Sequence, residues 1–251
     1  MNMNSTIKDK IVLALDVDGE REAKRLITEL KDYVGIFKVG LQIYTSMGDR
    51  LFSFMNEEKL KYFLDVKFMD IPNTVAKASE NIIKNGADFF NIHALGGIEM
   101  MSKAVESANM AAQEVGKASP VVLAVTVLTS ISNEKLNEEL NIPHNVNEYA
   151  MFLAKQAKVA GCSGVVASAF EARKIKEICG KEFKVLCPGI RPKWSATNDQ
   201  KRLATPSFAI DEGADYLVIG RAVTSADNKK EAMQKIYDEI GEYYESKTVI
   251  R

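Results

Sequence analysis

The sequence predicts an α/β protein in which eight parallel strands close into a (β/α)8 barrel. Three observations indicate this fold. The chain has 251 residues, close to the roughly 250 that such barrels need. Eight short apolar runs alternate with longer amphipathic segments, as in repeated βα units. No Gly-x-Gly-x-x-Gly loop follows the first run, which disfavours the alternative, a doubly wound open sheet.

The predicted strands are mostly continuous apolar runs, which is typical of parallel strands covered on both faces. In chain order they are Ile11–Leu15, Ile36–Val39, Tyr62–Val66, Phe89–His93, Val121–Thr126, Gly164–Ala167, Lys184–Cys187 and Tyr216–Ile219. Between them, apolar residues show the i, i+3, i+4 spacing of a buried helix face. This spacing recurs over Ala23–Val34, Met101–Ala108, Tyr149–Ala160 and Met233–Tyr244.

Turn signals and linkers define the domain organisation. Asn85-Gly86, Ala160-Gly161 and Glu212-Gly213 end three helices just before the next strand. Residues 131–148, which contain a proline and several asparagines, predict a longer surface loop after the fifth strand. No linker or low-complexity segment divides the chain, so we expect residues 1–251 to form a single domain, a TIM barrel.

Composition and charge narrow the class of function. Hydrophobic residues make up 46% and charged residues 27% of the chain, as in an ordinary soluble enzyme. The net charge of −1 gives no bulk attraction to nucleic acid or to an anionic membrane. No apolar run approaches the roughly 20 residues of a membrane span, and Met1–Lys10 lacks the apolar region of a signal peptide.

The cysteines and histidines predict the compartment and the metal content. Cys162, Cys179 and Cys187 are odd in number and widely spaced, so we interpret them as reduced thiols of a cytoplasmic protein. Only His93 and His144 are available as imidazole ligands. A metal site built from histidine and cysteine is therefore not expected.

The most informative motif is Asp65-x-Lys67-x-x-Asp70 at the end of the third predicted strand. Residues i and i+2 of a strand point to the same side, so Asp65 and Lys67 should emerge together. Pro72 then starts a helix, where its missing N–H costs nothing. Charges at the end of a buried strand indicate either a structural ion pair or chemistry.

Polar side chains lie at or just beyond the end of every predicted strand, where the active sites of such barrels are found. They are Asp16, Lys38, Asp65 with Lys67, His93, Thr126 with Thr129 and Ser130, Ser168, Arg191, and Arg221. For His93 a purely structural role at the rim is the alternative, and Asp16 could instead cap the following helix. Taken together, these residues predict that charged side chains converge at the carboxyl end of the barrel and line its opening.

The last two strand ends predict a phosphate site. Loops after the seventh and eighth strands of such barrels often bind phosphate. Gly189 and Gly220 allow close backbone approach, while Arg191 and Arg221 offer planar forks for phosphate oxygens. Either arginine could instead be a surface residue. The residues themselves thus predict a barrel enzyme that acts on a small phosphorylated substrate through a Lys/Asp cluster.

At this point the chain resembles the orotidine 5′-phosphate decarboxylase family, in its bacterial form, over nearly its whole length. The matching segments are Ala14–Asp16, Phe37–Gly40, Asp65–Thr74, Val127–Ser130, Pro188–Pro192, Asp199–Arg202 and Ile219–Arg221. One departure is Cys187, where this family leads us to expect a threonine beside the pocket.

The resemblance implies decarboxylation of orotidine 5′-monophosphate to uridine 5′-monophosphate in de novo pyrimidine biosynthesis, without metal, flavin or pyridoxal. Lys67 would donate the proton to C6 of the pyrimidine. Lys38, Asp65, Lys67 and Asp70 would form an alternating charge network. Asp70 and Thr74 would come from the other subunit of a homodimer.

The resemblance also implies a substrate-binding set. Its members are Asp16, Lys38, Asp65, Ile71, Thr74, Thr129, Ser130, Pro188, Arg191, Gln200, Gly220 and Arg221. Asp16 and Lys38 would contact the ribose, and Thr129 and Ser130 would lie near the pyrimidine. Arg191, Gly220 and Arg221 would hold the phosphate. Gln200 would bridge phosphate and base from a closing loop.

Two other functions stay open. Sugar-phosphate decarboxylases and aldolases related to this family also carry the Asp-x-Lys-x-x-Asp motif, but they use Mg²⁺ to stabilise an enediolate. The continuation Ile71-Pro72-Asn73-Thr74 and the Gln200 loop fit the nucleotide enzyme better. The other possibility is a non-catalytic phosphate-binding protein. The intact Lys67 between two aspartates argues against it.

Overall fold

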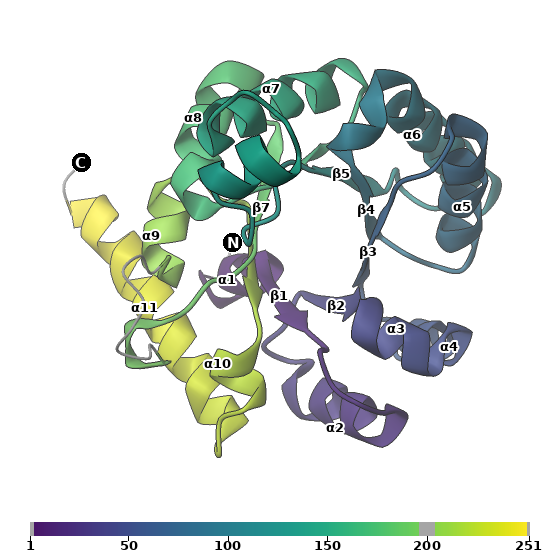
Figure 1. Cartoon of the computed structure of the whole chain (residues 1–251). Coiled ribbons are helices and arrows are strands. Elements are labelled where there is room, and N and C mark those ends of the chain that lie inside the picture. The colour runs from purple at the N-terminus through teal and green to yellow at the C-terminus, as the bar shows by residue number, and fades with distance from the viewer. Residues whose placement is uncertain (1–2, 196–203, 250–251) are drawn as a thin grey trace.

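The computed structural model describes residues 3–195 and 204–249. Within this part of the chain, eight parallel strands form a closed barrel in sequence order, and the last strand pairs with the first (Figure 1). The strands are β1 (Ile11–Ala14), β2 (Ile36–Gly40), β3 (Tyr62–Phe68), β4 (Phe89–His93), β5 (Val121–Val125), β6 (Gly164–Val166), β7 (Lys184–Cys187) and β8 (Tyr216–Ile219). The predicted fold class is confirmed.

Helices accompany the barrel; most form an outer ring around it, and the first lies nearer its centre in the view of Figure 1. They are α1 (Met3–Lys10), α2 (Glu20–Leu30), α3 (Leu41–Met47), α4 (Asp49–Glu57), α5 (Pro72–Lys84), α6 (Gly97–Glu114), α7 (Val146–Val159), α8 (Ala169–Cys179), α9 (Pro206–Asp211), α10 (Arg221–Thr224) and α11 (Lys229–Val249). Short turns are η1 (Ala94–Gly96), η2 (Lys135–Glu139) and η3 (Lys193–Ser195). No helix in the described ranges is long and apolar enough to cross a membrane.

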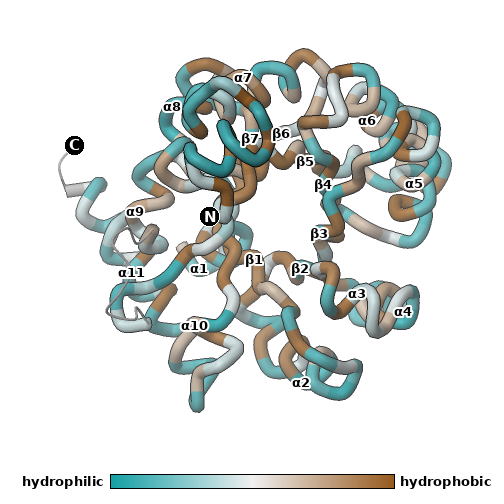
Figure 2. Tube along the Cα trace, viewed as in Figure 1, coloured by the Kyte–Doolittle hydropathy of each residue, from teal (hydrophilic) through white to brown (hydrophobic). Residues whose placement is uncertain are grey.

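Two apolar layers hold the barrel together, and Figure 2 shows the strands as largely hydrophobic. The larger layer lies between the strands and the helices and contains, for example, Leu13, Phe37 and Phe90. The smaller layer fills the barrel itself. It consists of Val12, Ala14, Ile36, Phe63, Phe89, Leu123, Leu186 and Val218. Alternation along each strand separates the two layers, because successive side chains point to opposite faces.

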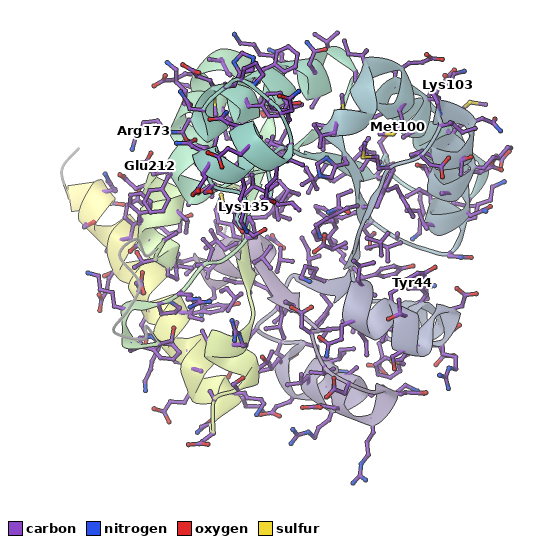
Figure 3. All side chains as sticks on the ribbon, in the orientation of Figure 1. Tyr44, Met100, Lys103, Lys135, Arg173 and Glu212 are labelled. Atoms are coloured by element: carbon purple, nitrogen blue, oxygen red, sulfur yellow. The ribbon has the colours of Figure 1, made fainter. Side chains whose placement is uncertain are left out.

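Charged side chains cover the outer surface of the helical ring. Figure 3 shows Arg173 of α8 beside Glu212, and their side chains pair at 3.0 Å between Nη2 and Oε1. Both lie far from the centre of the barrel in this view. Surface pairs of this kind contribute only about 0–1 kcal/mol each, so the fold depends mainly on its two apolar layers.

The prediction of a loop over 131–148 is wrong in part. The π-helical turn η2 lies within it, and α7 begins at Val146. The turn is stabilised because Leu136 is buried and because the Asn137 amide donates to the carbonyl oxygens of Ile142 and His144. Asn145 caps α7 by accepting the Glu148 N–H at 2.9 Å. The asparagines that indicated a loop are therefore turn and capping residues.

Candidate active site

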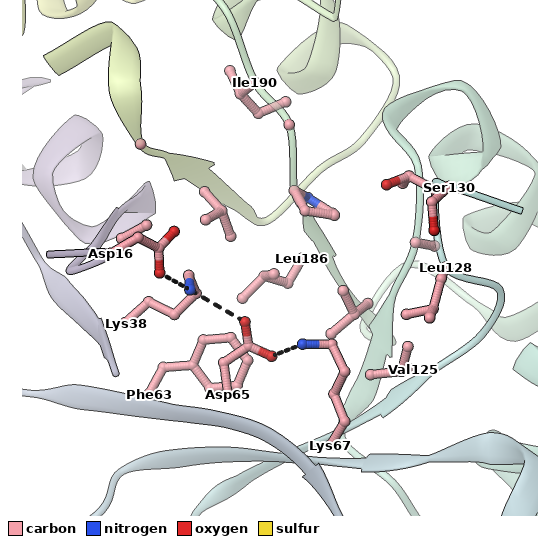
Figure 4. A pocket seen from close by; sticks show the side chains of 18 of the residues that line it. Asp16, Lys38, Phe63, Asp65, Lys67, Val125, Leu128, Ser130, Leu186 and Ile190 are labelled. Atoms are coloured by element: carbon pink, nitrogen blue, oxygen red, sulfur yellow. Dashed lines mark hydrogen bonds and ion pairs between the residues drawn. The ribbon is translucent and has the colours of Figure 1, made fainter. Parts of the chain in front are cut away.

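A cavity of about 400 Å³ opens at the carboxyl ends of the strands (Figure 4). Its floor is made by the apolar residues inside the barrel, among them Phe63, Leu186 and Val218. Its polar wall comes from residues at or just beyond the ends of β1, β2, β3, β5, β7 and β8. These are Asp16, Lys38, Asp65, Lys67, Thr129, Ser130, Arg191 and Arg221. The predicted convergence of strand ends therefore holds for most of the barrel.

Four of these side chains form a continuous chain of alternating charge (Figure 4). Lys38 Nζ lies 3.1 Å from Asp16 Oδ1 and 3.3 Å from Asp65 Oδ2. The other oxygen of Asp65, Oδ1, accepts a hydrogen bond from Lys67 Nζ at 2.6 Å. As predicted, Asp65 and Lys67 lie on the same side of β3. Asp16 does not cap the next helix, because the capping residue of α2 is Gly19.

The strand that carries Asp65 and Lys67 is irregular at this point. The pairing of β3 with β4 shifts register between Leu64 and Phe68. Within that interval Lys67 has a φ of 55°, in the left-handed region that side chains other than glycine and asparagine rarely adopt. The predicted strand ended at Val66, whereas β3 continues through this irregularity to Phe68.

A residue that the sequence analysis missed holds the irregularity. Asn91 of β4 is fully buried; its amide nitrogen donates to Asp65 Oδ1 at 2.7 Å, and its amide oxygen accepts the Lys67 N–H at 2.8 Å. The available signal was a single amide inside the apolar run Phe89-Phe90-Asn91-Ile92. A fully buried amide requires hydrogen-bonding partners.

The surroundings keep Asp65 ionised. Burial raises the pKa of this carboxyl group, but the charges of Lys38 and Lys67 and the hydrogen bonds from Lys67 and Asn91 outweigh burial, so the pKa is below its usual value. For His93, burial and the nearby charge of Lys67 lower the pKa. Its Nδ1 accepts the Leu95 N–H at 3.5 Å, and it does not line the cavity. This placement agrees with a structural rim histidine.

Two glycines and two arginines line another part of the cavity wall. Gly189, with a φ of 73°, and Gly220 bring backbone to the cavity wall beside Arg191 and Arg221. Arg191 is fixed by its backbone N–H, which donates to the Ala204 carbonyl at 3.0 Å. Among the described residues, neither guanidinium group has a carboxylate partner. A guanidinium group can hold a phosphate through two parallel hydrogen bonds.

Comparison with known proteins agrees with this geometry. Residues 9–236 match the model of the orotidine 5′-phosphate decarboxylase / HUMPS family. The chain belongs to this family. It is 46% identical over 236 residues to the orotidine 5′-phosphate decarboxylase of Syntrophomonas wolfei, covering 94% of this chain and 99% of that relative. For the protein of that name from Heliobacterium modesticaldum, the identity is 42% over 235 residues, with 94% and 97% covered.

Solved structures of the family share the fold. The crystal structure of orotidine 5′-phosphate decarboxylase from Lactobacillus acidophilus is similar with a TM-score of 0.81 and 35% identity, covering 92% of this chain and 98% of that one. The enzyme from Pyrococcus horikoshii gives a TM-score of 0.70 at 26% identity, with 92% and 98% covered. These comparisons confirm the family that the motifs predicted.

Several residues to which the family resemblance assigned roles lie outside the cavity. Asp70, Ile71 and Thr74 are exposed and do not line it. Asp70 Oδ1 accepts the N–H of its neighbour Ile71 at 2.7 Å. Gln200 lies outside the described residues. Pro188 and Gly220 line the cavity as expected.

Two further expectations concern cysteine and metal. Cys187, at the position where a threonine was expected, is fully buried at the end of β7 and is not part of the cavity wall. Burial raises the pKa of its thiol. Across residues 3–195 and 204–249, no group of three or more histidine, cysteine, aspartate or glutamate side chains is arranged to hold a metal ion.

Proposed function

We propose that this chain decarboxylates orotidine 5′-monophosphate to uridine 5′-monophosphate, the UMP-forming step of de novo pyrimidine biosynthesis. The observation that carries the proposal is the Lys67 ammonium group, held 2.6 Å from Asp65 at the wall of the cavity in a member of this family. An ammonium placed beside a reacting carbon can stabilise negative charge and then donate a proton.

The reaction follows from this placement. The bond between C6 and the carboxylate breaks, CO₂ leaves, and the electron pair stays on C6 in the plane of the ring, where the π system cannot delocalise it. The Lys67 ammonium stabilises this carbanion electrostatically and gives it a proton, forming the C6–H bond of the product. Solvent then returns a proton to the lysine. Asp65 holds Lys67 in place, because its Oδ1 accepts a hydrogen bond from Lys67 Nζ at 2.6 Å.

The rest of the cavity orients the nucleotide. We assign the phosphate to Arg191, Gly220 and Arg221, and the ribose hydroxyls to Asp16 and Lys38. Thr129 and Ser130 then face the pyrimidine, and to Gln200, which lies outside the described residues, we assign contacts with both phosphate and base. The phosphate is remote from C6, so its binding energy can hold the ring against Lys67 and lower the barrier. On this assignment the residues themselves supply the chemistry, and no metal, flavin or pyridoxal takes part.

We further propose that the enzyme is a cytoplasmic homodimer in which Asp70, Ile71 and Thr74 reach the neighbouring active site. The exposed Asp70 carboxylate is unused by its own cavity. Large exposed apolar side chains flank it, with Met69 55% and Ile71 67% exposed. Leu95 in η1 and Ile98 at the start of α6 are also exposed, and α6 packs against α5. Apolar side chains gathered in this way are typical of an interface.

Mixing two inactive variants tests the shared site. In a heterodimer of Lys67→Ala and Asp70→Ala subunits, one of the two sites regains both groups. Random reassociation should therefore restore about one quarter of the wild-type rate. Lys67→Ala mixed with Lys38→Ala is the matched control and should restore nothing, because both groups come from one chain. A mixture of Lys67→Ala and Asp70→Ala that stays inactive would refute the shared site.

An absorbance assay with orotidine 5′-phosphate as substrate tests the activity itself, with and without EDTA. We expect turnover that EDTA leaves unchanged. Loss of turnover with EDTA would favour the enediolate chemistry of the Mg²⁺-dependent relatives. A pure dimer that binds UMP but releases no CO₂ would instead indicate a phosphate-ligand binding protein.

A further inference from the structure

Asn91 has an unusual environment for a polar side chain. It lies in the middle of β4, between the fully buried Phe90 and Ile92, and is itself 0% exposed. Burying an amide without hydrogen bonds destabilises the folded protein. An aliphatic residue would fill this position at lower cost unless the amide has a specific task.

The amide has two partners, and both belong to the proposed catalytic motif. Asn91 Nδ2 donates to Asp65 Oδ1 at 2.7 Å, the same oxygen that accepts from Lys67 Nζ at 2.6 Å. Asn91 Oδ1 accepts the backbone N–H of Lys67 at 2.8 Å. One side chain thus binds the carboxylate that holds the ammonium and also the backbone from which that ammonium extends.

The second hydrogen bond replaces part of the strand ladder. Between Leu64 and Phe68 the pairing of β3 with β4 is interrupted, and Lys67 takes a φ of 55° there. A residue other than glycine in this sparsely populated conformation is strained, and the conformation persists only when its surroundings enforce it. The Asn91 oxygen receives the N–H that this conformation turns away from the ladder.

We infer that Asn91 is a positioning residue: its buried amide locks Asp65 and the left-handed backbone of Lys67 together and thereby sets where the Lys67 ammonium lies in the cavity. The inference rests on the proposed decarboxylation for its kinetic consequence. Its structural consequence, the φ of Lys67, is independent of that function.

The first test is Asn91→Leu, which has a similar volume and no hydrogen-bonding groups. We expect kcat to fall by about 100-fold, the effect of misplacing a reacting group by about 1 Å. The dissociation constant for UMP should change by less than about threefold, because the phosphate contacts are untouched. A loss of UMP affinity equal to the loss of kcat would contradict a positioning role.

Tyr62→Phe is the matched control. Tyr62 is equally buried, at the opposite end of β3, and its hydroxyl donates to the Asn85 carbonyl at 2.7 Å. Removing that hydrogen bond should lower thermal stability and leave kcat unchanged. If both variants lost kcat in proportion to stability, Asn91 would be a structural residue only.

Asn91→Asp tests the positioning role independently of whether the leucine variant folds. The aspartate retains an acceptor for the Lys67 N–H but sets a second carboxylate against Asp65 in place of the amide donor. We expect a folded protein with kcat reduced by at least about tenfold. A kcat within about twofold of wild type would overturn the inference.

A crystal structure of Asn91→Leu separates this inference from the proposed function. We expect Lys67 to leave the left-handed region and its ammonium to leave Asp65. An unchanged Lys67 would refute the positioning role even if the wild type decarboxylates its substrate. Conversely, an inactive wild type would refute the proposed function, while the φ of Lys67 in the variant would still decide the role of Asn91.

Discussion

The two ends of the barrel each contain an aspartate between two lysines, but only the pair at the carboxyl end lines the cavity. At the carboxyl end Asp65 lies 2.6 Å from Lys67 and 3.3 Å from Lys38. At the amino end Asp215 lies 2.6 Å from Lys176 and 3.7 Å from Lys184. Distance and residue type do not distinguish the two clusters.

The hydrogen bonds do distinguish them. At the amino end Lys176 Nζ also donates to the Lys181 carbonyl, and Asp215 Oδ2 also accepts the Val185 N–H. Both partners are thus tied to backbone. At the carboxyl end the Lys67 ammonium has one acceptor among the described residues, Asp65. An ammonium has three N–H donors, so Lys67 keeps free donors at the cavity, on a strained backbone.

Replacing one lysine at each end of the barrel should give the largest difference in kcat between the two clusters. Lys67→Ala removes the proton donor that we propose and its positive charge, so kcat should fall by at least about 10⁴-fold with the fold intact. Lys176→Ala should leave kcat unchanged and lower the free energy of unfolding by about 1–3 kcal/mol. Steady-state kinetics and urea denaturation measure the two effects. Normal turnover in Lys67→Ala would contradict its assigned role.

The phosphate side of the cavity gives the next largest effect. Arg221→Ala should lower kcat/KM for orotidine 5′-phosphate by roughly 100-fold, because a charge-assisted fork to the phosphate is lost. The substrate without phosphate, orotidine, should be processed equally slowly by both proteins and serves as the control. If wild type processed orotidine as well as the phosphorylated substrate, the phosphate assignment would be wrong.

A smaller loss of activity is expected from a substitution beside the Lys38–Asp16 pair at the carboxyl end. A Cβ on Gly40 would lie 2.7 Å from Lys38 Nζ and 3.0 Å from Asp16 Oδ1. Both atoms end flexible side chains, so Gly40→Ala should displace the pair without unfolding the strand. We expect kcat/KM to fall by about tenfold with little change in melting temperature. Gly19→Ala, where a Cβ meets nothing within 4 Å, is the control and should keep full activity.

Cys187→Thr should have the smallest effect. The side chain is buried at the end of β7 and does not line the cavity. Restoring the residue expected from the family should change kcat by less than about threefold, although a buried hydroxyl can cost about 1 kcal/mol of stability. A larger change in kcat would mean that this position shapes the cavity from behind.

Much of the fold and site could be predicted from the sequence because the signals are local. Apolar runs and helical spacing located the eight strands, and the period of two placed Asp65 beside Lys67. The left-handed backbone at Lys67 and the two hydrogen bonds of the Asn91 amide could not be predicted, since they depend on how β3 and β4 pair. Within a single run of apolar letters, one asparagine does not reveal which neighbours it contacts.

The amino-end cluster was missed for a related reason. Lys176, Lys184 and Asp215 are separated in sequence by a helix and a strand, and nothing in their local pattern brings them together. Asp70 shows the reverse case. Its motif predicts a role in the site, yet its own chain leaves it exposed, so the role that we propose for it requires a second subunit.

A crystal structure of the protein with UMP tests most directly whether the Lys67 ammonium is placed at the reacting carbon. We predict Lys67 Nζ within about 3.5 Å of C6 of the pyrimidine, still hydrogen-bonded to Asp65, with the phosphate between Arg191 and Arg221. A Lys67 nitrogen that lies far from C6, or that faces bulk solvent in the complex, would contradict the proposed mechanism.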